Sequence, residues 1–304
     1  ERLMREITPP RYQQILQEQG STDFAYAYSD LARFRTAVFR TRGNIGIVMR
    51  LIPHRILSFE QLGLPKESIV EILHAHRGMV VVTGPTGSGK TTTLATMIDY
   101  INGNRYVHII TVEDPIEYFH PHKKSIVTHR ELHVDTPTFA FAMRGALRMD
   151  PDVILLGEMR DLETMEAALV AAETGHLVFS TLHTISASQT VDRVVDAFPV
   201  TQQEQIRSVL AVALRTIIAQ TLLPRASGKG RVAAYEILHN TPAVQNLIRE
   251  HKTNRIVSIL QTSSKQGMIT MDDYLLNLYR QNIITGEIAL ERCHYPSEMR
   301  MKMM

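Results

Sequence analysis

The sequence predicts an α/β fold with a doubly wound parallel sheet, and three observations lead to this prediction. Short apolar runs recur between residues 79 and 182, as expected for strands that are buried on both faces. Segments with helical periodicity separate these runs, and a glycine-rich loop directly follows the first one. The runs are Met79–Val82, Val107–Val112, Val153–Leu156 and Leu177–Leu182.

Start and stop signals place helices between these runs. One helix is expected to begin at Lys90 in the glycine-rich loop, one at Thr136, and one to run from Asp161 to Thr174. Gly175 would end the last of these, because glycine readily adopts the left-handed conformation that closes many helices.

Beyond residue 200 the strand pattern fades, apart from Gly230–Ile237. Thr201 and Glu204 have the spacing of a capping box, which predicts a long amphipathic helix ending near Pro224. Further helices are expected to open at three threonines, so the end of the chain is predicted to be a helical subdomain. These threonines are Thr241, Thr253 and Thr270.

Residues 1–52 have the pattern of a small antiparallel unit. Thr8 is expected to cap a helix that continues to Gly20. Aromatic residues then alternate along a strand that ends near Tyr28, and two further strands follow, joined by a turn at 41–44. We therefore expect a first domain over 1–52, a linker over 53–58 and a second domain over 59–304.

The composition is typical of a globular protein and disfavours several classes. Of the 304 residues, 44% are hydrophobic and 21% charged, and the formal net charge is +2. This mild charge, with 6% aromatic residues and no tryptophan, does not favour a nucleic-acid surface. The lone Cys293 excludes an intramolecular disulfide and a zinc site of cysteine pairs, and it fits a reducing cytoplasm. No apolar run approaches the roughly 20 residues of a membrane helix, so membrane association would be peripheral.

The segment from Gly84 to Thr91 matches the P-loop pattern G-x-x-x-x-G-K-[ST]. Its glycines let backbone N–H groups surround phosphates, and the start of the next helix adds partial positive charge. Lys90 is expected to reach the phosphates, and the Thr91 hydroxyl to ligate Mg²⁺. A plain glycine-rich turn is the alternative, which the flanking strand and helix disfavour. The predicted nucleotide-binding residues are Gly84, Pro85, Thr86, Gly87, Ser88, Gly89, Lys90, Thr91 and Thr92.

Polar residues end or follow the other three apolar runs, namely Glu113, Glu158 and His183. Because the carboxyl ends of parallel strands share one edge of a sheet, these side chains are expected to converge on the phosphates. Gly157 stands where a Walker B segment usually has an aspartate, so Glu158 alone is assigned to the magnesium ion or its waters. Glu113 is then the candidate that polarises the attacking water. A surface charge or a helix cap is the alternative for each carboxylate.

Two histidines flank the fourth apolar run. His176 and His183 lie at opposite ends of the predicted strand, and no third ligand lies nearby, which disfavours a metal site. His183 lies at the phosphate edge and is expected to sense the γ-phosphate, whereas a structural role suffices for His176.

Four segments resemble the signature boxes of the secretion ATPase superfamily, and the similarity extends from Ala32 to about Arg249. Within that superfamily they most resemble the PilT branch, the retraction ATPases of type IV pili. The resemblance implies a RecA-like domain with a helical C-terminal part, preceded by a truncated PAS-like α+β domain. The boxes are the P-loop at Gly84–Thr91, the Asp box at Ile110–Glu117, the Walker B segment at Asp152–Asp161 and the His box at Gly175–Thr184.

The same resemblance implies a homohexameric motor that hydrolyses ATP, with Mg²⁺, to retract the pilus in twitching motility. It assigns water activation to Glu113 and magnesium to Glu158. It also implies a place at the cytoplasmic face of the inner membrane. The implied partners are the platform protein of the pilus machine and a paralogous retraction ATPase, with no nucleic acid. Gln245 departs from a family arginine, and residues 124–130 also resemble the PilU paralogue, so both branches stay open.

Three other functions are compatible with a P-loop. A pilus assembly or type II secretion ATPase generally carries a tetracysteine zinc insert, which a single cysteine disfavours. A RecA-like nucleic-acid translocase would need basic grooves with stacking aromatic residues. A non-catalytic nucleotide-binding scaffold is disfavoured by the intact set of Lys90, Thr91, Glu113 and Glu158.

A predicted hairpin places two arginines opposite each other. If its turn lies at Arg42 and Gly43, Arg35 faces Arg50 and both side chains project from one face of the sheet. Like charges so placed are destabilising unless an anion lies near them. One interpretation is a solvated charged face. The other, supported by the family resemblance, is a pair of arginine fingers directed at the γ-phosphate. Whether they act on the nucleotide of a neighbouring subunit is left open at this point.

Overall fold

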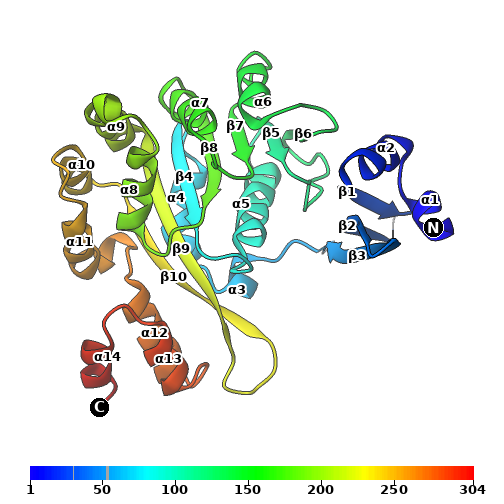
Figure 1. Cartoon of the computed structure of the whole chain (residues 1–304). Coiled ribbons are helices and arrows are strands. Elements are labelled where there is room, and N and C mark those ends of the chain that lie inside the picture. The colour runs from blue at the N-terminus through cyan, green and yellow to red at the C-terminus, as the bar shows by residue number, and fades with distance from the viewer. Residues whose placement is uncertain (30, 53–54) are drawn as a thin grey trace.

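The computed structural model describes residues 1–29, 31–52 and 55–304. A small three-stranded sheet lies near the N-terminus, and a seven-stranded sheet with helices on both faces forms the larger part of the molecule (Figure 1). The predicted α/β fold class is confirmed. Within the described ranges, no helix is both long enough and apolar enough to cross a membrane.

The N-terminal unit is an antiparallel sheet in the order β1-β2-β3. Helix α2 covers the face that carries the buried side chains of Phe24 and Val38, and Gly20 ends this helix with a φ of 79°. The predicted cap by Thr8 is wrong, because Pro9 holds the N-cap position without a side-chain acceptor. The elements are α1 (Arg2–Ile7), α2 (Pro10–Gln19), β1 (Ser21–Tyr28), β2 (Ala32–Thr41) and β3 (Asn44–Ile52).

A single connection joins this unit to the larger sheet between β3 and α3 (Phe59–Leu62) (Figure 1). Residues 55–58 belong to no helix or strand. Pro53 and His54, the first residues of the expected linker, lie outside the described residues. The division at 52 and 59 stays a prediction.

The large sheet has the strand order β10-β9-β4-β8-β7-β5-β6. Neighbouring strands are parallel except for β10, which is antiparallel to β9. The four predicted apolar runs correspond to β4, β5, β7 and β8. The strands are β4 (Gly78–Thr83), β5 (His108–Glu113), β6 (Ile126–Glu131), β7 (Val153–Leu156), β8 (Leu177–Leu182), β9 (Leu214–Pro224) and β10 (Arg231–His239).

Two strands of this sheet are not predicted by the sequence pattern. The first is β6, whose sequence is largely polar. The second is β9: the helix expected to end near Pro224 is wrong, because α9 (Val200–Ala213) ends earlier and the chain continues as a strand. Thr201 does not cap α9 either, since Pro199 is its N-cap residue. Because β9 pairs with both β4 and β10, ladder hydrogen bonds outweigh the local helical pattern around Ile217 and Ile218.

Helices cover both faces of the large sheet (Figure 1). Successive residues of β4 alternate between the two cores, with Val80 in one and Val81 in the other. The Val80 core contains α3, α4 (Lys66–Leu73) and α5 (Lys90–Asn104). The Val81 core contains α6 (Phe139–Ala146), α7 (Leu162–Glu173), α8 (Ala187–Asp196) and α9.

The remaining helices form a C-terminal helical part, as predicted. Thr241 and Thr270 cap α10 and α12, because each hydroxyl accepts a backbone N–H bond from the first helical turn. Helices α12 to α14 pack around Leu223 and Ala234 on the hairpin of β9 and β10. The helices are α10 (Pro242–Arg249), α11 (Ile256–Thr262), α12 (Met271–Arg280), α13 (Gly286–Arg292) and α14 (Pro296–Met303), with short 3-10 turns at Thr253–Arg255 and Ser264–Gln266.

The first prediction concerns a buried tyrosine that ties β10 to α3. The Tyr235 hydroxyl donates to the Leu62 carbonyl at 3.1 Å, and its side chain is fully buried. Tyr235→Phe should therefore lower the free energy of unfolding by about 1 kcal/mol, because the carbonyl loses its donor. Urea unfolding without nucleotide measures this. Tyr106→Phe is the control, since that ring is 83% exposed; equal losses in both variants would contradict the assignment.

Candidate nucleotide-binding and catalytic site

The P-loop connects β4 to α5 and depends on glycine at several positions. Gly84, Gly87 and Gly89 all have φ in the left-handed region, at 144°, 78° and 91°. A side chain on Gly84 would also collide with the Gln220 carbonyl of β9. These conformations let the backbone curl tightly before Lys90 begins the helix.

Gln220 holds this loop from the side. Its amide nitrogen donates to the Ser88 carbonyl at 2.6 Å, and its amide oxygen accepts from the Thr93 hydroxyl at 2.8 Å. All of these atoms are buried. Sequence patterns missed Gln220 because its segment was predicted to be helical; the strand pairing of β9 is what brings it to the loop.

Lys90 is folded back onto its own loop. Its ammonium group donates to the carbonyls of Gly84 at 2.8 Å and Pro85 at 3.2 Å. Burial lowers the pKa of this group, and the carboxylates of Glu158 and Glu117 oppose the shift. The lysine thus has only loop carbonyls as hydrogen-bond acceptors among the described residues and is free to turn toward an anion.

Glu113 ends β5 in a fully desolvated position. Its Oε2 accepts a long bond of 3.4 Å from the Glu117 amide, and its Oε1 is buried without a hydrogen-bond partner among the described residues. Burial raises the pKa of this carboxyl to about 7, and the charges of Glu117 and Glu131 add to the rise. A carboxylate with a free acceptor oxygen and a pKa in this range is suited to accept a proton.

Glu158 and His183 meet at the ends of β7 and β8. The Glu158 carboxylate lies 2.6 Å from the Arg160 guanidinium and 3.5 Å from His183 Nε2. Arg160 was not among the residues predicted from the sequence. His176 lies at the other end of β8, where its Nδ1 is 3.0 Å from the Ala171 carbonyl. This contact is consistent with a structural role for His176.

One cavity of about 460 Å³ brings the predicted residues together. Its wall contains residues of the P-loop, of three strand ends and of the N-terminal hairpin. The predicted register of that hairpin is confirmed, because Arg35 is paired with Arg50 between β2 and β3. Both arginines line the cavity beside the P-loop of their own chain. Arg231 of β10 also lines it and was not predicted. The predicted catalytic and metal residues on this wall are Arg35, Arg50, Lys90, Thr91, Glu113, Glu158 and His183.

The residues present fit a polyphosphate and its divalent cation. Three left-handed glycines curl the loop, which is the backbone shape that exposes N–H groups to an anion. The Ser88 hydroxyl is buried without a partner in the described part of the chain, so it can donate a hydrogen bond to a phosphate oxygen. Thr91 and Glu158 place oxygen atoms on the same wall, which is the donor type that Mg²⁺ prefers.

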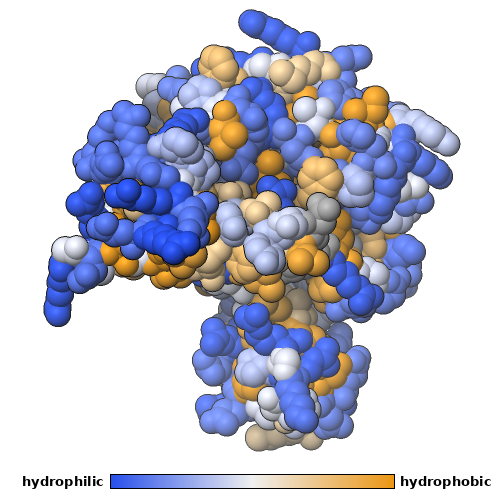
Figure 2. Space-filling view, turned by 90° about the vertical axis from the view of Figure 1, so that its right-hand side faces the viewer, coloured by the Kyte–Doolittle hydropathy of each residue, from blue (hydrophilic) through white to orange (hydrophobic). Residues whose placement is uncertain are grey.

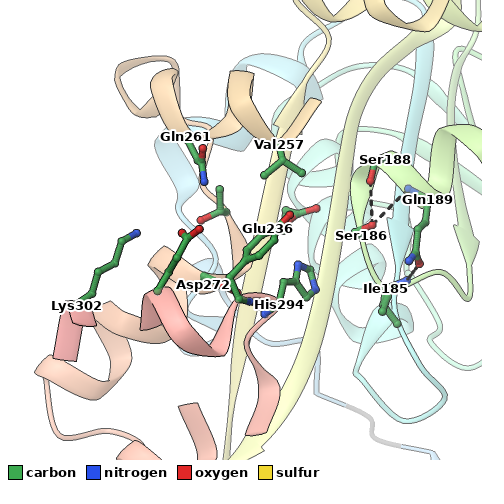
Figure 3. A pocket seen from close by; sticks show the side chains of 13 residues that line it. Ile185, Ser186, Ser188, Gln189, Glu236, Val257, Gln261, Asp272, His294 and Lys302 are labelled. Atoms are coloured by element: carbon green, nitrogen blue, oxygen red, sulfur yellow. Dashed lines mark hydrogen bonds between the residues drawn. The ribbon is translucent and has the colours of Figure 1, made fainter. Parts of the chain in front are cut away.

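A second cavity, of about 240 Å³, lies between the start of α8 and the C-terminal helices (Figure 3). Glu236 of β10 is buried there, and its Oε1 accepts from the Ala187 amide at 2.7 Å. Asp272 accepts from the backbone amides of His294 and Tyr295. No residue of the P-loop lines this cavity, so it is separate from the phosphate site.

Comparison with known proteins identifies the family. The model of the "Type II/IV secretion system protein" family matches residues 25–284. This chain belongs to that family. The match includes all four boxes and the strands that deliver their side chains.

Two relatives with high similarity have names that refer to pilus retraction or to twitching motility. The "Type IV pilus retractation ATPase PilT" of Pseudomonas aeruginosa is 48% identical over 294 residues, which are 97% of this chain and 85% of that protein. The "Twitching motility protein" of Neisseria gonorrhoeae is 52% identical over 285 residues, 94% of this chain and 76% of that protein. A crystal structure of the pilus retraction motor PilT with bound ADP has a TM-score of 0.92 and 50% identity, covering 99% of this chain and 85% of that one. The resemblance to the PilT branch is confirmed.

The second prediction follows from the buried state of Glu113. The raised pKa means that the carboxyl keeps its proton up to about pH 7, so the basic form is present above this pH and is lost below it. We expect kcat/KM for ATP to fall about tenfold per unit as the pH drops below roughly 7, since this ratio reports the free enzyme. A pH series of ATPase rates measures the effect. The residual activity of Glu113→Gln should lack this decline; an unchanged decline would assign it to another group.

Proposed function

We propose that the chain is an ATP-hydrolysing motor that powers the retraction of type IV pili and thereby twitching motility. The observation that carries the proposal is the single cavity in which a P-loop, two carboxylates, a histidine and two arginines converge. The high identity to proteins named as a PilT retraction ATPase and a twitching motility protein supports the direction of the motion.

In this proposal the P-loop binds the β- and γ-phosphates of ATP. The left-handed glycines curl the loop, and α5 begins at its end, so the N-terminus of this helix lies at the proposed phosphate site. Lys90 exchanges its two loop carbonyls for phosphate oxygens. Thr91 and Glu158 would hold Mg²⁺ or its waters. The ion, when bound, neutralises charge on the phosphates.

Glu113 is the proposed general base. Its free Oε1 accepts the proton of the attacking water. His183 Nε2 lies 3.5 Å from the Glu158 carboxylate. In this proposal His183 senses the γ-phosphate through its contact with Glu158. Gly157 leaves space beside the strand end, because a side chain there would press on the Val112 carbonyl and on Glu113.

Arg35 and Arg50 are the proposed arginine fingers. Both residues line the same cavity as the P-loop of their own chain, which favours action on that chain's nucleotide rather than on a neighbour's. Two cations side by side on a sheet face are costly by themselves, and an anion between them removes that cost. The developing charge on a transferred phosphoryl group is such an anion.

We further propose a ring of six subunits at the cytoplasmic face of the inner membrane, with the pilus platform protein and a paralogous retraction ATPase as partners. β3 is an edge strand, and its large apolar side chains Val48 and Leu51 are more than half exposed. Hydrophobic residues interrupt the hydrophilic surface on this side of the molecule (Figure 2). Exposed apolar residues on a strand edge favour a protein partner. The family resemblance supplies the number six and the partners' identities.

The third prediction tests the chemistry. Lys90→Ala should lose ATP binding, whereas Glu158→Gln should bind ATP and hydrolyse it poorly. Glu113→Gln should retain nucleotide affinity while kcat falls by about 10²-fold or more, as for a lost general base. Steady-state ATPase rates and nucleotide titrations measure turnover and affinity. Wild-type rates in Glu158→Gln would reassign the magnesium carboxylate.

The proposed ring has its own test. Light scattering gives the mass of the assembly, and a chain that stays monomeric at high concentration with ATP would contradict the ring.

The fourth prediction tests on whose nucleotide the arginines act. Arg50→Ala and Lys90→Ala should each be inactive, and rings that mix them should stay inactive. In such rings every subunit lacks either its P-loop lysine or its own finger. Recovery of ATPase activity in subunit-exchanged mixtures would instead show action across an interface. An active Arg35→Ala, Arg50→Ala double variant would remove both arginines from the chemistry.

A further inference from the structure

His183 lies just beyond the point where the pairing of β4 and β8 ends. The last pair of this parallel ladder is Thr83 with Leu182, so backbone pairing between the two strands no longer holds the chain at His183. The His183 side chain is 55% exposed, and the structure gives it a polar contact with the Glu158 carboxylate at 3.5 Å. The position of this ring therefore depends on what holds the backbone next to it.

A threonine side chain continues the contact between the strands where the backbone ladder stops. The Thr83 hydroxyl donates to the Thr184 carbonyl at 2.7 Å and lies 2.8 Å from the Thr184 hydroxyl. Thr83 is fully buried, and the next residue, Gly84, begins the P-loop and accepts from Lys90 Nζ at 2.8 Å. These bonds join the residue after His183 to the residue before the P-loop.

Helix α8 holds the same segment from the other side. The Thr184 hydroxyl lies 2.7 Å from the Thr190 hydroxyl, which donates to the Ser186 carbonyl at 2.8 Å. Thr190 is buried, and Ser186 caps the helix by accepting from the Gln189 amide at 3.3 Å. Removing the Thr184 hydroxyl breaks its contacts on both sides, whichever oxygen of each pair is the donor. Thr184 is consequently held between the end of β4 and the start of α8.

We propose that Thr83 and Thr184 are positioning residues that hold His183 where the γ-phosphate of ATP would lie. Neither threonine belongs to the wall of the nucleotide cavity, whereas His183 does, so both act through His183 and do not touch the nucleotide. The proposal rests on the proposed function, in which His183 senses the γ-phosphate. Such a contact needs placement to within about 0.5 Å, which the hydroxyl bonds supply beyond the end of the ladder.

A positioning role predicts a loss that depends on the γ-phosphate. Without the Thr184 hydroxyl, His183 would shift relative to this phosphate, while the contacts of the P-loop with the other phosphates remain. Thr184→Val should therefore weaken the binding of a non-hydrolysable ATP analogue about three- to tenfold, as expected for a lost hydrogen bond, and leave the affinity for ADP unchanged. Thr83→Val should lower the ratio of these two affinities in the same way. A threonine with a merely structural role would weaken the binding of both nucleotides equally.

The experiment combines nucleotide titrations with a double-mutant cycle on the full chain. His183→Ala should lower the ratio of the two affinities, and adding Thr184→Val should lower it no further, because both changes remove one contact. Thr184→Ser, which keeps the hydroxyl, should restore the wild-type ratio. Thr216→Val is the control, since it removes a buried hydroxyl that lies 3.0 Å from His239 Nδ1 and does not belong to the cavity wall. Its ratio should match the wild type.

Several results would overturn the inference. A wild-type ratio in Thr184→Val, an equal loss of ADP affinity, a multiplied loss in the double variant, or no recovery in Thr184→Ser would each do so. If circular dichroism shows Thr184→Val to be unfolded, Thr83→Val compared with Thr83→Ser decides. Failure of the proposed function looks different: the wild type would lack ATPase activity, or His183→Ala would itself keep the wild-type ratio, and the inference would then fall with it.

Discussion

The hydrogen bonds of Gln220 hold the P-loop on which the rest of the site depends. One amide group bonds to Ser88 inside the loop and to Thr93 in the first turn of α5, so β9 clamps both ends of the phosphate-binding turn. The approach is so close that Gly84 has no room for a side chain. Because β9 and β8 flank β4 in the sheet, the distance from the loop to the carboxylates is set by ladder pairing and not by flexible loops.

The cavity contains ionisable side chains in positions that are unfavourable for their charged forms. Arg35 faces Arg50 across a hairpin, and burial lowers the pKa of Lys90 by disfavouring its charged form. In the same cavity, burial and like charges raise the pKa of Glu113. An anionic polyphosphate would supply the counter-charge that the two arginines and Lys90 lack, whereas the buried Glu113 carboxyl gains nothing from an anion. Departure from ordinary charge placement thus marks the site independently of any motif.

The sequence predicts those parts of the site whose position follows from local pattern. The P-loop and Glu113 both lie where an apolar run ends, and the hairpin register follows from counting residues around a two-residue turn. Gln220 could not be predicted in this way, because β9 is a strand only through its pairing with β4 and β10. Arg231 lies on a segment that was predicted to be a strand, but only the antiparallel pairing of β10 with β9 shows where in the sheet that strand lies. Arg160 was also missed: an arginine in a loop gives no signal until its distance from Glu158 is known.

Strand β6 shows why the setting of the proposed base is a tertiary property. Its sequence is too polar to predict a buried strand, yet it lies beside β5 and places His129 and Glu131 opposite Thr111 and Glu113. Glu131 raises the pKa of the Glu113 carboxyl through its charge, and the Thr111 hydroxyl lowers it. Desolvation remains the largest cause, so the buried strand end itself brings the pKa to about 7 and β6 only adjusts it. A polar edge strand is therefore compatible with a desolvated base, provided that each of its polar groups has a partner, as His129 does on both ring nitrogens.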